Sequence, residues 1–234
     1  AVRCIRDIVC RGKVPLVVGG SGLYIRALWA GWASGVKPDL KFRKQLEQEA
    51  ARDGSPVLYE RLRAVDPARA RQIQPNDQKR IIRALEIIKQ TKSSSTRNRT
   101  RPPKSLADLG YQPVMIGIQK DRARLYRDIE KRVDAMFRKG LVREVRGFTR
   151  KAVSNTARQA LGYKEIFDFL KGEMLLSDAK DLIKKRTRHF AKRQMTWFRR
   201  EPVAQWFSIS DTSSADSVAK DILLWLQMRW NIFA

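Results

Sequence analysis

The sequence has few of the residues that hold metal ions or form covalent cross-links. It contains two cysteines, Cys4 and Cys10, and a single histidine, His189. A structural zinc site needs about four such ligands, and the histidine is far from the cysteines in sequence. We therefore predict reduced cysteines on a helix, as in a cytoplasmic protein, and no metal site made of protein ligands.

Long apolar runs are absent as well. The C-terminal stretch Ile222–Ala234 is apolar but short, and Gln227, Arg229 and Asn231 interrupt it, so we expect a packed helix and no membrane partner. The first fourteen residues lack a basic head followed by an apolar stretch, which excludes a secretory signal there. The chain begins with alanine and not methionine, which suggests a fragment.

Acidic residues are scarce relative to basic ones. The chain has 24 Asp and Glu against 49 Lys and Arg, a formal net charge of +25. Such an excess favours a polyanionic partner, because Lys and Arg gain free energy by displacing counterions from phosphates. A solvated surface that favours solubility and an acidic membrane surface are the alternatives, but nucleic acid fits best.

The order of patterns predicts one α/β domain that carries a subdomain. Val14–Val18 reads as a buried strand, Leu23–Leu28 as the next helix, and Val114–Ile118 as a second strand of the same parallel sheet. A helical excursion separates the two strands. We expect a partial α/β core over 1–34, an inserted helical subdomain over 35–107, and the rest of the core with basic helices over 108–234.

Most of the remaining chain is predicted to be helical. Within the insert, apolar spacing and breaks at Gly54, Pro67 and Pro75 indicate helices over about 42–52, 58–65, 68–73 and 77–88. Thr91–Ser105 has no apolar periodicity and is rich in Ser, Arg and Pro, which predicts a mobile basic loop. Later helices are predicted over 122–138, 142–149, 157–170, 177–200 and 214–230.

A glycine-rich turn follows the first predicted strand. Gly19, Gly20, Ser21 and Gly22 connect the β-branched run to an apolar helix. Glycines let a backbone approach a ligand closely and a helix N-terminus favours anions, so this turn could present N–H groups and one hydroxyl to a phosphate. Similar turns connect strands to helices in many α/β proteins, and the pattern alone favours that plain structural role.

A basic cluster at a helix start allows two roles. Lys79, Arg80 and Arg83 lie where the helix dipole favours phosphate. A solvated face with Arg83–Glu86 pairing fits the spacing better.

The stretch around Arg132 also allows two roles. Arg132 and Asp134 are either surface charges or an anion-binding arginine that a carboxylate positions. Their helix has an apolar stripe made of Ile129, Val133 and Met136.

Two further stretches combine aromatic and basic residues. Tyr163 follows Gly162 and is flanked by Arg158 and Lys164. Its ring either stacks on an unpaired base or packs inward at a helix start.

The stretch 184–200 is almost solid Lys and Arg around aromatics, which favours an RNA-binding helix over an ordinary charged face. His189 has no partner in sequence and is interpreted as a phosphate neighbour or surface residue. Alternating spacings of four and three predict an inward face made of Ile183, Thr187, Phe190, Gln194 and Trp197.

Taken together, five stretches resemble tRNA dimethylallyltransferases, the enzymes that prenylate adenosine next to the anticodon. They occur in the family's order and spacing and cover nearly the whole chain. The stretches are GGSGLYIRAL, DPARARQIQPNDQKRIIRALEI, LYRDIEKRVDAMFRKGL, RQALGYKEIFDFL and TRHFAKRQMTWFRR.

The resemblance implies a P-loop-kinase-like parallel sheet core, incomplete in this chain, with an inserted helical subdomain and a helical C-terminal part. It implies transfer of a dimethylallyl group from dimethylallyl diphosphate to N6 of adenosine 37, with Mg²⁺ on the diphosphate. The expected partner is the tRNA anticodon stem-loop, and we expect a monomer.

The resemblance also implies roles for individual residues. Ser21 occupies the place of a threonine whose hydroxyl contacts the oxygen between the allyl group and the diphosphate, which makes Ser21 the candidate catalytic residue. The diphosphate would be held by Gly19, Gly20, Ser21, Gly22 and Arg132. The tRNA would be bound by Lys79, Arg80, Ile81, Ile82, Arg83, Gln159, Ala160, Leu161, Gly162, Tyr163, Lys164, Lys192, Arg193, Gln194, Met195, Thr196, Trp197, Phe198 and Arg199.

The sequence also departs from the family pattern. The family begins with a P-loop that carries Lys and Ser/Thr, followed by a general-base Asp, and neither is found here. We therefore expect the C-terminal two thirds of such an enzyme, without part of its donor site and inactive alone. A non-catalytic RNA-binding fragment is the main alternative; a small-molecule kinase fits the basic aromatic tail poorly.

Overall fold

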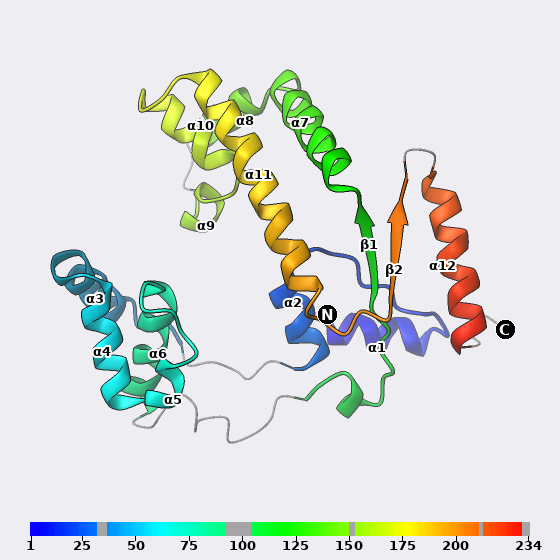
Figure 1. The fold of residues 1–234 in the computed structure, drawn as a ribbon, viewed down its shortest axis with the longest axis horizontal. Helices are drawn as coiled ribbons and strands as arrows, with labels where there is room; N and C mark the ends of the chain where they lie inside the picture. The colour runs from blue at the N-terminus through cyan, green and yellow to red at the C-terminus, as the bar shows by residue number, and fades with distance from the viewer. Residues whose placement is uncertain (32–36, 92–103, 150–152, 211–212, 231–234) are drawn as a thin grey trace. The chain divides into compact units, whose positions relative to one another are not determined.

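The structure is a computed structural model, and it describes residues 1–31, 37–91, 104–149, 153–210 and 213–230 (Figure 1). The chain divides into two compact units. The first comprises residues 1–17 and 23–113, and the second comprises residues 18–22 and 114–234.

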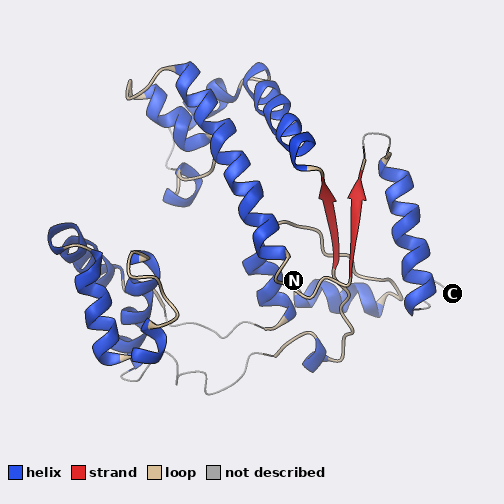
Figure 2. Cartoon of the chain, viewed as in Figure 1, coloured by secondary structure: helices blue, strands red, loops and turns tan. Residues whose placement is uncertain are grey.

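Helices dominate residues 1–113. After α1 and α2, four helices follow in close succession before the one-turn 3₁₀ helix η1, as Figure 2 shows in blue. The bounds are α1 Val2–Cys10, α2 Gly22–Trp29, α3 Leu40–Asp53, α4 Ser55–Val65, α5 Pro67–Ala70, α6 Gln78–Thr91 and η1 Ala107–Leu109.

The helices α3–α6 form a bundle with its own apolar core. Leu46, Leu58, Leu62 and Ile81 are each at most 1% exposed and pack together. Their three- and four-residue spacing places them on one face of each helix, as the sequence predicted. Burial of these faces, at roughly 25 cal/mol per Å² of apolar surface, is the main stabilisation of the bundle.

Two aspartates begin helices of this bundle. The Asp39 carboxylate accepts a hydrogen bond from the Phe42 N–H at 2.9 Å, and that of Asp66 accepts one from the Arg69 N–H at 3.0 Å. Each bond satisfies an N–H group that has no partner within the helix. Asp66 is only 2% exposed and precedes Pro67, so its side chain fixes the corner between α4 and α5.

The second unit contains a parallel pair of strands joined by a long helical crossover. Strand β1, Ile116–Lys120, pairs in register with β2, Gln205–Ile209. Parallel strands require such a crossover, because the chain must return to the same end of the sheet. The helices are α7 Arg122–Arg138, α8 Leu141–Thr149, α9 Asn155–Arg158, α10 Tyr163–Leu170, α11 Leu176–Phe198 and, after β2, α12 Ala215–Trp230.

Aromatic side chains cover the strand pair. The Trp206 indole lies where a Cβ on its register partner Gly117 would be, so Gly117 is needed for close packing. On the same strand, Phe207 meets Trp225 of α12 edge to face, with ring centroids 6.0 Å apart. This contact holds α12 beside β2 (Figure 1).

The core of the second unit lies among α7, α8, α10 and α11. Its most buried members are Val133, Val145, Ile166, Ala179 and Ile183, each at most 2% exposed. Ile183 is in the first half of α11, so this half of the long helix is part of the core. The predicted fold class is confirmed, since the described chain is mostly helical with a small parallel sheet.

Three predictions about elements are wrong. Val14–Val18 is no strand: it has no regular structure, and Leu16 and Val18 are each 85% exposed. The partner of β1 is instead β2, which the sequence did not reveal. The predicted helix over 157–170 is interrupted, because Gly162 adopts a φ of +96° between α9 and α10.

One prediction falls largely outside the described residues: the basic loop predicted over Thr91–Ser105 lies mostly within 92–103. The helix predicted over 214–230 is present as α12. Across the described part of the chain, no helix is both long and apolar enough to traverse a bilayer.

Candidate RNA and diphosphate site

The glycine-rich turn lies against the C-terminal part of α11. Gln194 donates a hydrogen bond from its side-chain amide to the Gly20 carbonyl at 2.9 Å. A Cβ on Gly20 would collide with this amide, and a Cβ on Gly22 would collide with the Trp197 indole. Close approach to α11 therefore accounts for two of the three glycines, and the Ser21 side chain stays exposed.

Ion pairs hold α7 along the first half of α11. Asp134 lies 2.8 Å from the ammonium groups of both Lys180 and Lys184, and Glu130 accepts a hydrogen bond from Arg188 at 2.6 Å. Hydrogen bonds from the two lysines lower the pKa of Asp134 to about 2. Part of the basic charge of α11 therefore anchors α7.

Arg132 is not positioned by Asp134, because the aspartate is bound to the lysines of α11. The Arg132 side chain is exposed on α7. In the described part of the chain it forms no hydrogen bond or ion pair, with the turn or with any other residue. It is thus free to bind an anion from outside, but the structure does not bring it together with Ser21.

A buried carboxylate joins the Gln159–Gly162 stretch to α11. Glu165 is 1% exposed; its Oε2 accepts a hydrogen bond from the Gly162 N–H at 2.8 Å. Its Oε1 accepts one from the Arg186 guanidinium at 2.5 Å. Both carboxylate oxygens of Glu165 accept hydrogen bonds, so this residue connects the turn before α10 to the middle of α11.

Tyr163 packs inward, which decides between its two possible roles. Its ring is 5.7 Å from that of Phe148, centroid to centroid, and its hydroxyl donates a hydrogen bond to Glu144. That bond raises the pKa of Tyr163 above its ordinary value. The ring therefore packs against the core, as the inward interpretation of this residue expected.

Phe190 was predicted to face inward and does not. Its side chain is 45% exposed, and the Arg193 guanidinium lies 5.9 Å from the ring centroid. Gln194 and Trp197, farther along the same predicted face, do contact the glycine-rich turn, so Phe190 is the exception, in the part of α11 that lies beyond the core around Ile183.

Phe190 borders a cavity that we call the α10–α11 cavity. Its volume is about 360 Å³, within the range of small-ligand sites. His189 also lines it, which agrees with the interpretation of this residue as a surface group. The lining residues are Gln159, Leu161, Lys164, Glu165, Arg186, His189, Phe190 and Arg193.

A smaller hollow adjoins the α10–α11 cavity and shares Gln159 and Lys164 with it. Its volume is about 180 Å³, and Arg158 and Lys171 add two further cations. The hollowed surface along α10 is thus basic over two neighbouring depressions.

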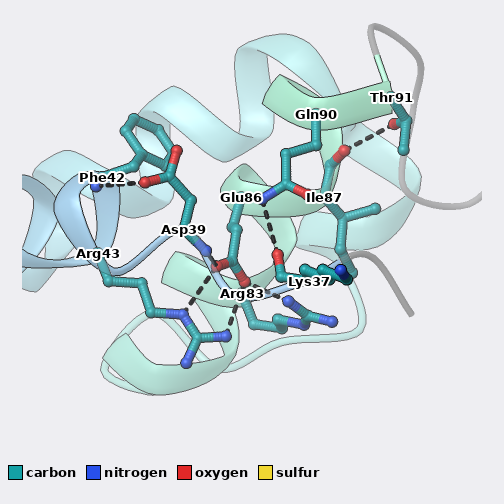
Figure 3. Close-up of polar contacts among 9 residues, drawn as sticks. All are labelled: Lys37, Asp39, Phe42, Arg43, Arg83, Glu86, Ile87, Gln90 and Thr91. Atoms are coloured by element: carbon teal, nitrogen blue, oxygen red, sulfur yellow. Dashed lines mark hydrogen bonds and ion pairs between the residues drawn. The ribbon is translucent and has the colours of Figure 1, made fainter. Parts of the chain in front are cut away.

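In the bundle, a second buried carboxylate organises the start of the basic stretch (Figure 3). Glu86 accepts hydrogen bonds from Arg43 at 2.8 and 2.9 Å, from the Asp39 N–H at 2.6 Å and from Arg83. Burial alone would raise the pKa of Glu86, but the bonds from both arginines and the Asp39 N–H outweigh it and lower the pKa to about 2.

The predicted pairing of Arg83 with Glu86 is present, but it involves a buried carboxylate and not a solvated face. Ile81 and Ile82 are 0% and 5% exposed and belong to the bundle core. Lys79 and Arg80 remain as the exposed cations of this stretch, and Arg80 lies 3.3 Å from Asp77.

The predicted tRNA-binding residues therefore differ in accessibility. The exposed ones are Lys79, Arg80, Gln159, Ala160, Leu161, Lys164, Lys192, Arg193, Thr196 and Arg199. The partly or fully buried ones are Ile81, Ile82, Arg83, Gly162, Tyr163, Gln194, Met195, Trp197 and Phe198.

Sequence reasoning missed Glu165 and Arg186 as a pair. They are 21 residues apart, so no helical spacing connects them. The only signal was a Glu three residues after a glycine, a pattern that caps a helix start.

Comparisons with known proteins show the family to which the chain belongs. The family model described as "IPP transferase" matches residues 1–201. A tRNA dimethylallyltransferase from Desulforudis audaxviator is 42% identical over 228 residues, which cover 95% of this chain and 72% of the relative.

Solved structures give the same result. A full-length tRNA isopentenylpyrophosphate transferase from Bacillus halodurans superposes with a TM-score of 0.61 at 35% identity, covering 95% of this chain and 69% of that one. A eukaryotic dimethylallyltransferase acting on tRNA gives 0.70 at 25% identity, covering 95% and 58%. On the strength of the match over residues 1–201 and of these relatives, the chain belongs to the IPP transferase family of prenyltransferases.

Proposed function

We propose that this protein transfers a dimethylallyl group from dimethylallyl diphosphate to N6 of adenosine 37 in tRNA. Family membership supports the proposal, and one structural observation carries it. Along α11, Gln194 and Trp197 contact the glycine-rich turn, while Phe190 and Arg193 border a basic cavity. One helix therefore contacts both the candidate donor turn and the candidate RNA surface.

The reaction forms one bond and breaks one. N6 attacks the allylic carbon, the carbon–oxygen bond breaks with its electron pair leaving on the diphosphate, and the proton that N6 loses passes to solvent water. On the donor side this chain supplies the N–H groups of Gly19–Gly22 and the exposed Ser21 hydroxyl. Such donors stabilise the oxygen on which negative charge develops. Arg132 is exposed on α7 and does not contact this turn, so it would add its positive charge only if its side chain moves to the diphosphate.

We propose that Mg²⁺ enters with the diphosphate. The described residues contain no group of three or more His, Cys, Asp or Glu side chains able to hold a metal ion. Mg²⁺ commonly takes most of its ligands from substrate phosphates and water, so it does not need such a group of side chains. When bound, the ion neutralises charge on the leaving diphosphate.

The test uses the 234-residue chain, tRNA with adenosine at position 37, dimethylallyl diphosphate and Mg²⁺. The tRNA is digested and prenylated adenosine is measured by mass. Ser21→Ala should lower the transfer rate by about 10²- to 10³-fold, the effect of removing one such donor, and Ser21→Thr should retain it. If the wild type forms product, an equal rate for Ser21→Ala would contradict the role of Ser21.

A second candidate, a non-catalytic RNA-binding protein, is favoured by the lack of any GxxxxGK[ST] phosphate loop in the 234 residues. Binding of tRNA without any prenylated product would support it. Product formation by this chain would exclude it, and the lack of both binding and product would contradict both candidates.

A further inference from the structure

We propose that Gln194 is a positioning residue for the allyl donor: its side-chain amide holds the Gly20 carbonyl and thereby directs the Ser21 N–H toward the diphosphate. The inference rests on the proposed prenyl transfer and deepens the account of the glycine-rich turn. The resemblance places Gln194 among the residues that bind tRNA, and the comparisons give it no role. The role proposed here concerns the other substrate.

The planarity of one peptide group connects the two backbone atoms. The Gly20 carbonyl and the Ser21 N–H belong to the same peptide bond, which is trans. In a trans peptide the oxygen and the hydrogen point in opposite directions. Gln194 donates its hydrogen bond to this oxygen at 2.9 Å, so the oxygen faces α11 and the Ser21 N–H faces away from it.

This orientation of the peptide group favours an anion at the turn. Ser21 is exposed, and its N–H and hydroxyl are both hydrogen-bond donors. If the peptide group were flipped, the Gly20 carbonyl would face the diphosphate and repel it. Glycine makes such a flip easy, because a residue without Cβ has access to more backbone conformations. The bond from Gln194 therefore selects the orientation that accepts a diphosphate.

The lack of a side chain at position 20 serves the same bond. The φ of Gly20 lies outside the left-handed region, so its backbone conformation is open to alanine. A Cβ there would lie 2.4 Å from Nε2 of Gln194 and would displace the amide from the carbonyl. At Gly19, by contrast, a Cβ would meet nothing within 4 Å. The glycine at position 20 is therefore explained by the amide that it accommodates.

Trp197 holds another residue of the turn from the same face of α11. It follows Gln194 by three residues, so both side chains lie on one side of the helix. A Cβ on Gly22 would lie 2.2 Å from the indole nitrogen of Trp197. The turn is thus held at Gly20 by a hydrogen bond and at Gly22 by packing before any ligand binds. A fixed geometry lowers the entropic cost of binding the donor there.

The experiment is a double-mutant cycle between the two residues of the bond. The variants are Gln194→Ala, Gly20→Ala and the double variant, and the matched control is Gln227→Ala, which shortens an exposed glutamine of α12. For each protein, calorimetry measures the dissociation constant of dimethylallyl diphosphate with Mg²⁺, without RNA and with an anticodon stem-loop that lacks the acceptor base. The dissociation constant of the stem-loop itself is measured in parallel.

Gln194→Ala should weaken donor binding by about 2- to 10-fold, the contribution of one neutral hydrogen bond. Gly20→Ala should have a similar effect, but it should add nothing in the Gln194→Ala background, because the amide with which its methyl group collides is gone. Gln227→Ala should bind the donor like the wild type, and stem-loop affinity should not change in any variant. In the transfer assay, kcat/KM for dimethylallyl diphosphate should fall by the same factor while the KM for tRNA stays unchanged.

Three results would overturn the inference alone. The first is a donor affinity that Gln194→Ala leaves unchanged. The second is an additive loss in the double variant, which would mean that a methyl group at position 20 blocks the donor by itself. The third is weaker stem-loop binding by Gln194→Ala with unchanged donor binding, which would return Gln194 to the tRNA-binding residues.

The proposed function fails in a different way. A wild type that binds the donor but forms no prenylated adenosine would contradict the proposed function, and the cycle of donor affinities would still decide the role of Gln194. A wild type that does not bind the donor would contradict both.

Discussion

Glu86 in α6 and Glu165 in α10 are both buried carboxylates that arginines hold, but their surroundings differ. Glu86 accepts bonds from Arg43, Arg83 and the Asp39 N–H, and it ties both ends of the bundle segment together. Glu165 binds one arginine, Arg186, and one turn, and it borders the α10–α11 cavity.

The comparison separates a structural carboxylate from one that supports a candidate site. Near Glu86, Arg43 and Arg83 already form ion pairs with the carboxylate, so little positive charge remains for a ligand. Next to Glu165, Lys164 and Arg193 keep their charge available. A buried ion pair is by itself weak support for function, and the unpaired cations around it are what point to a polyanion.

The largest expected effect is on stability. Glu86→Gln leaves two arginines without a carboxylate, so the free energy of unfolding should fall by about 3–5 kcal/mol. Glu165→Gln leaves one arginine, which is 39% exposed and can turn to water, so the loss should be about 1–3 kcal/mol. Urea unfolding followed by circular dichroism measures both.

Under conditions in which both variants are folded, Glu165→Gln should weaken stem-loop binding more than Glu86→Gln does. The reverse order in either measurement would remove the distinction between the two carboxylates.

Acid should weaken the bundle through Glu86. Its pKa is lowered from 4.5 to about 2 in the folded protein, so its stabilisation is complete above pH 4.5 and is lost as the pH falls toward 2. The loss amounts to at most about 3 kcal/mol. Unfolding free energies measured at pH 7, 4 and 3 should fall less steeply in Glu86→Gln than in the wild type.

Asp134 titrates in the same direction, because its pKa is also lowered to about 2. Some acid dependence should therefore remain in Glu86→Gln. Identical pH profiles of unfolding free energy for the variant and the wild type would show that Glu86 does not cause the loss of stability in acid.

A smaller effect is expected at the glycine-rich turn. Gly22→Ala places a methyl group against the Trp197 indole, whereas a Cβ on Gly19 meets nothing within 4 Å. Overpacking of this kind costs about 1–3 kcal/mol, so thermal unfolding should show a lower midpoint for Gly22→Ala than for Gly19→Ala. Equal midpoints would mean that the turn does not pack on α11 as described.

The sequence predicted the helices of the bundle well, because each buries an apolar face with regular spacing around Leu46, Leu62 and Ile81. It failed where long-range pairing decides the structure. Val14–Val18 has a strand-like composition but no strand partner among the described residues, and Gln205–Ile209 mixes polar and aromatic residues instead of a β-branched run.

For the candidate site, the sequence identified the basic stretches but not their geometry. Gln194 and Trp197 were assigned to tRNA, and the structure shows them in contact with the glycine turn. Phe190 was expected inside because periodicity describes a helix face and does not show that this face is uncovered between the core at Ile183 and the glycine-rich turn at Gln194. The Glu165–Arg186 pair depends on the packing of α10 on α11, which no local pattern encodes.

The most direct test of the central claim is the salt dependence of stem-loop binding. If Lys164 and Arg193 contact RNA phosphates, the double variant Lys164→Ala/Arg193→Ala should reduce the slope of log Kd against log salt by about 1.4, or about 0.7 for each single-strand contact. Lys220→Ala/Arg229→Ala, which removes two exposed cations of α12, should leave the slope within error of the wild type. Equal slopes for both double variants would contradict the claim that the surface between α10 and α11 binds RNA.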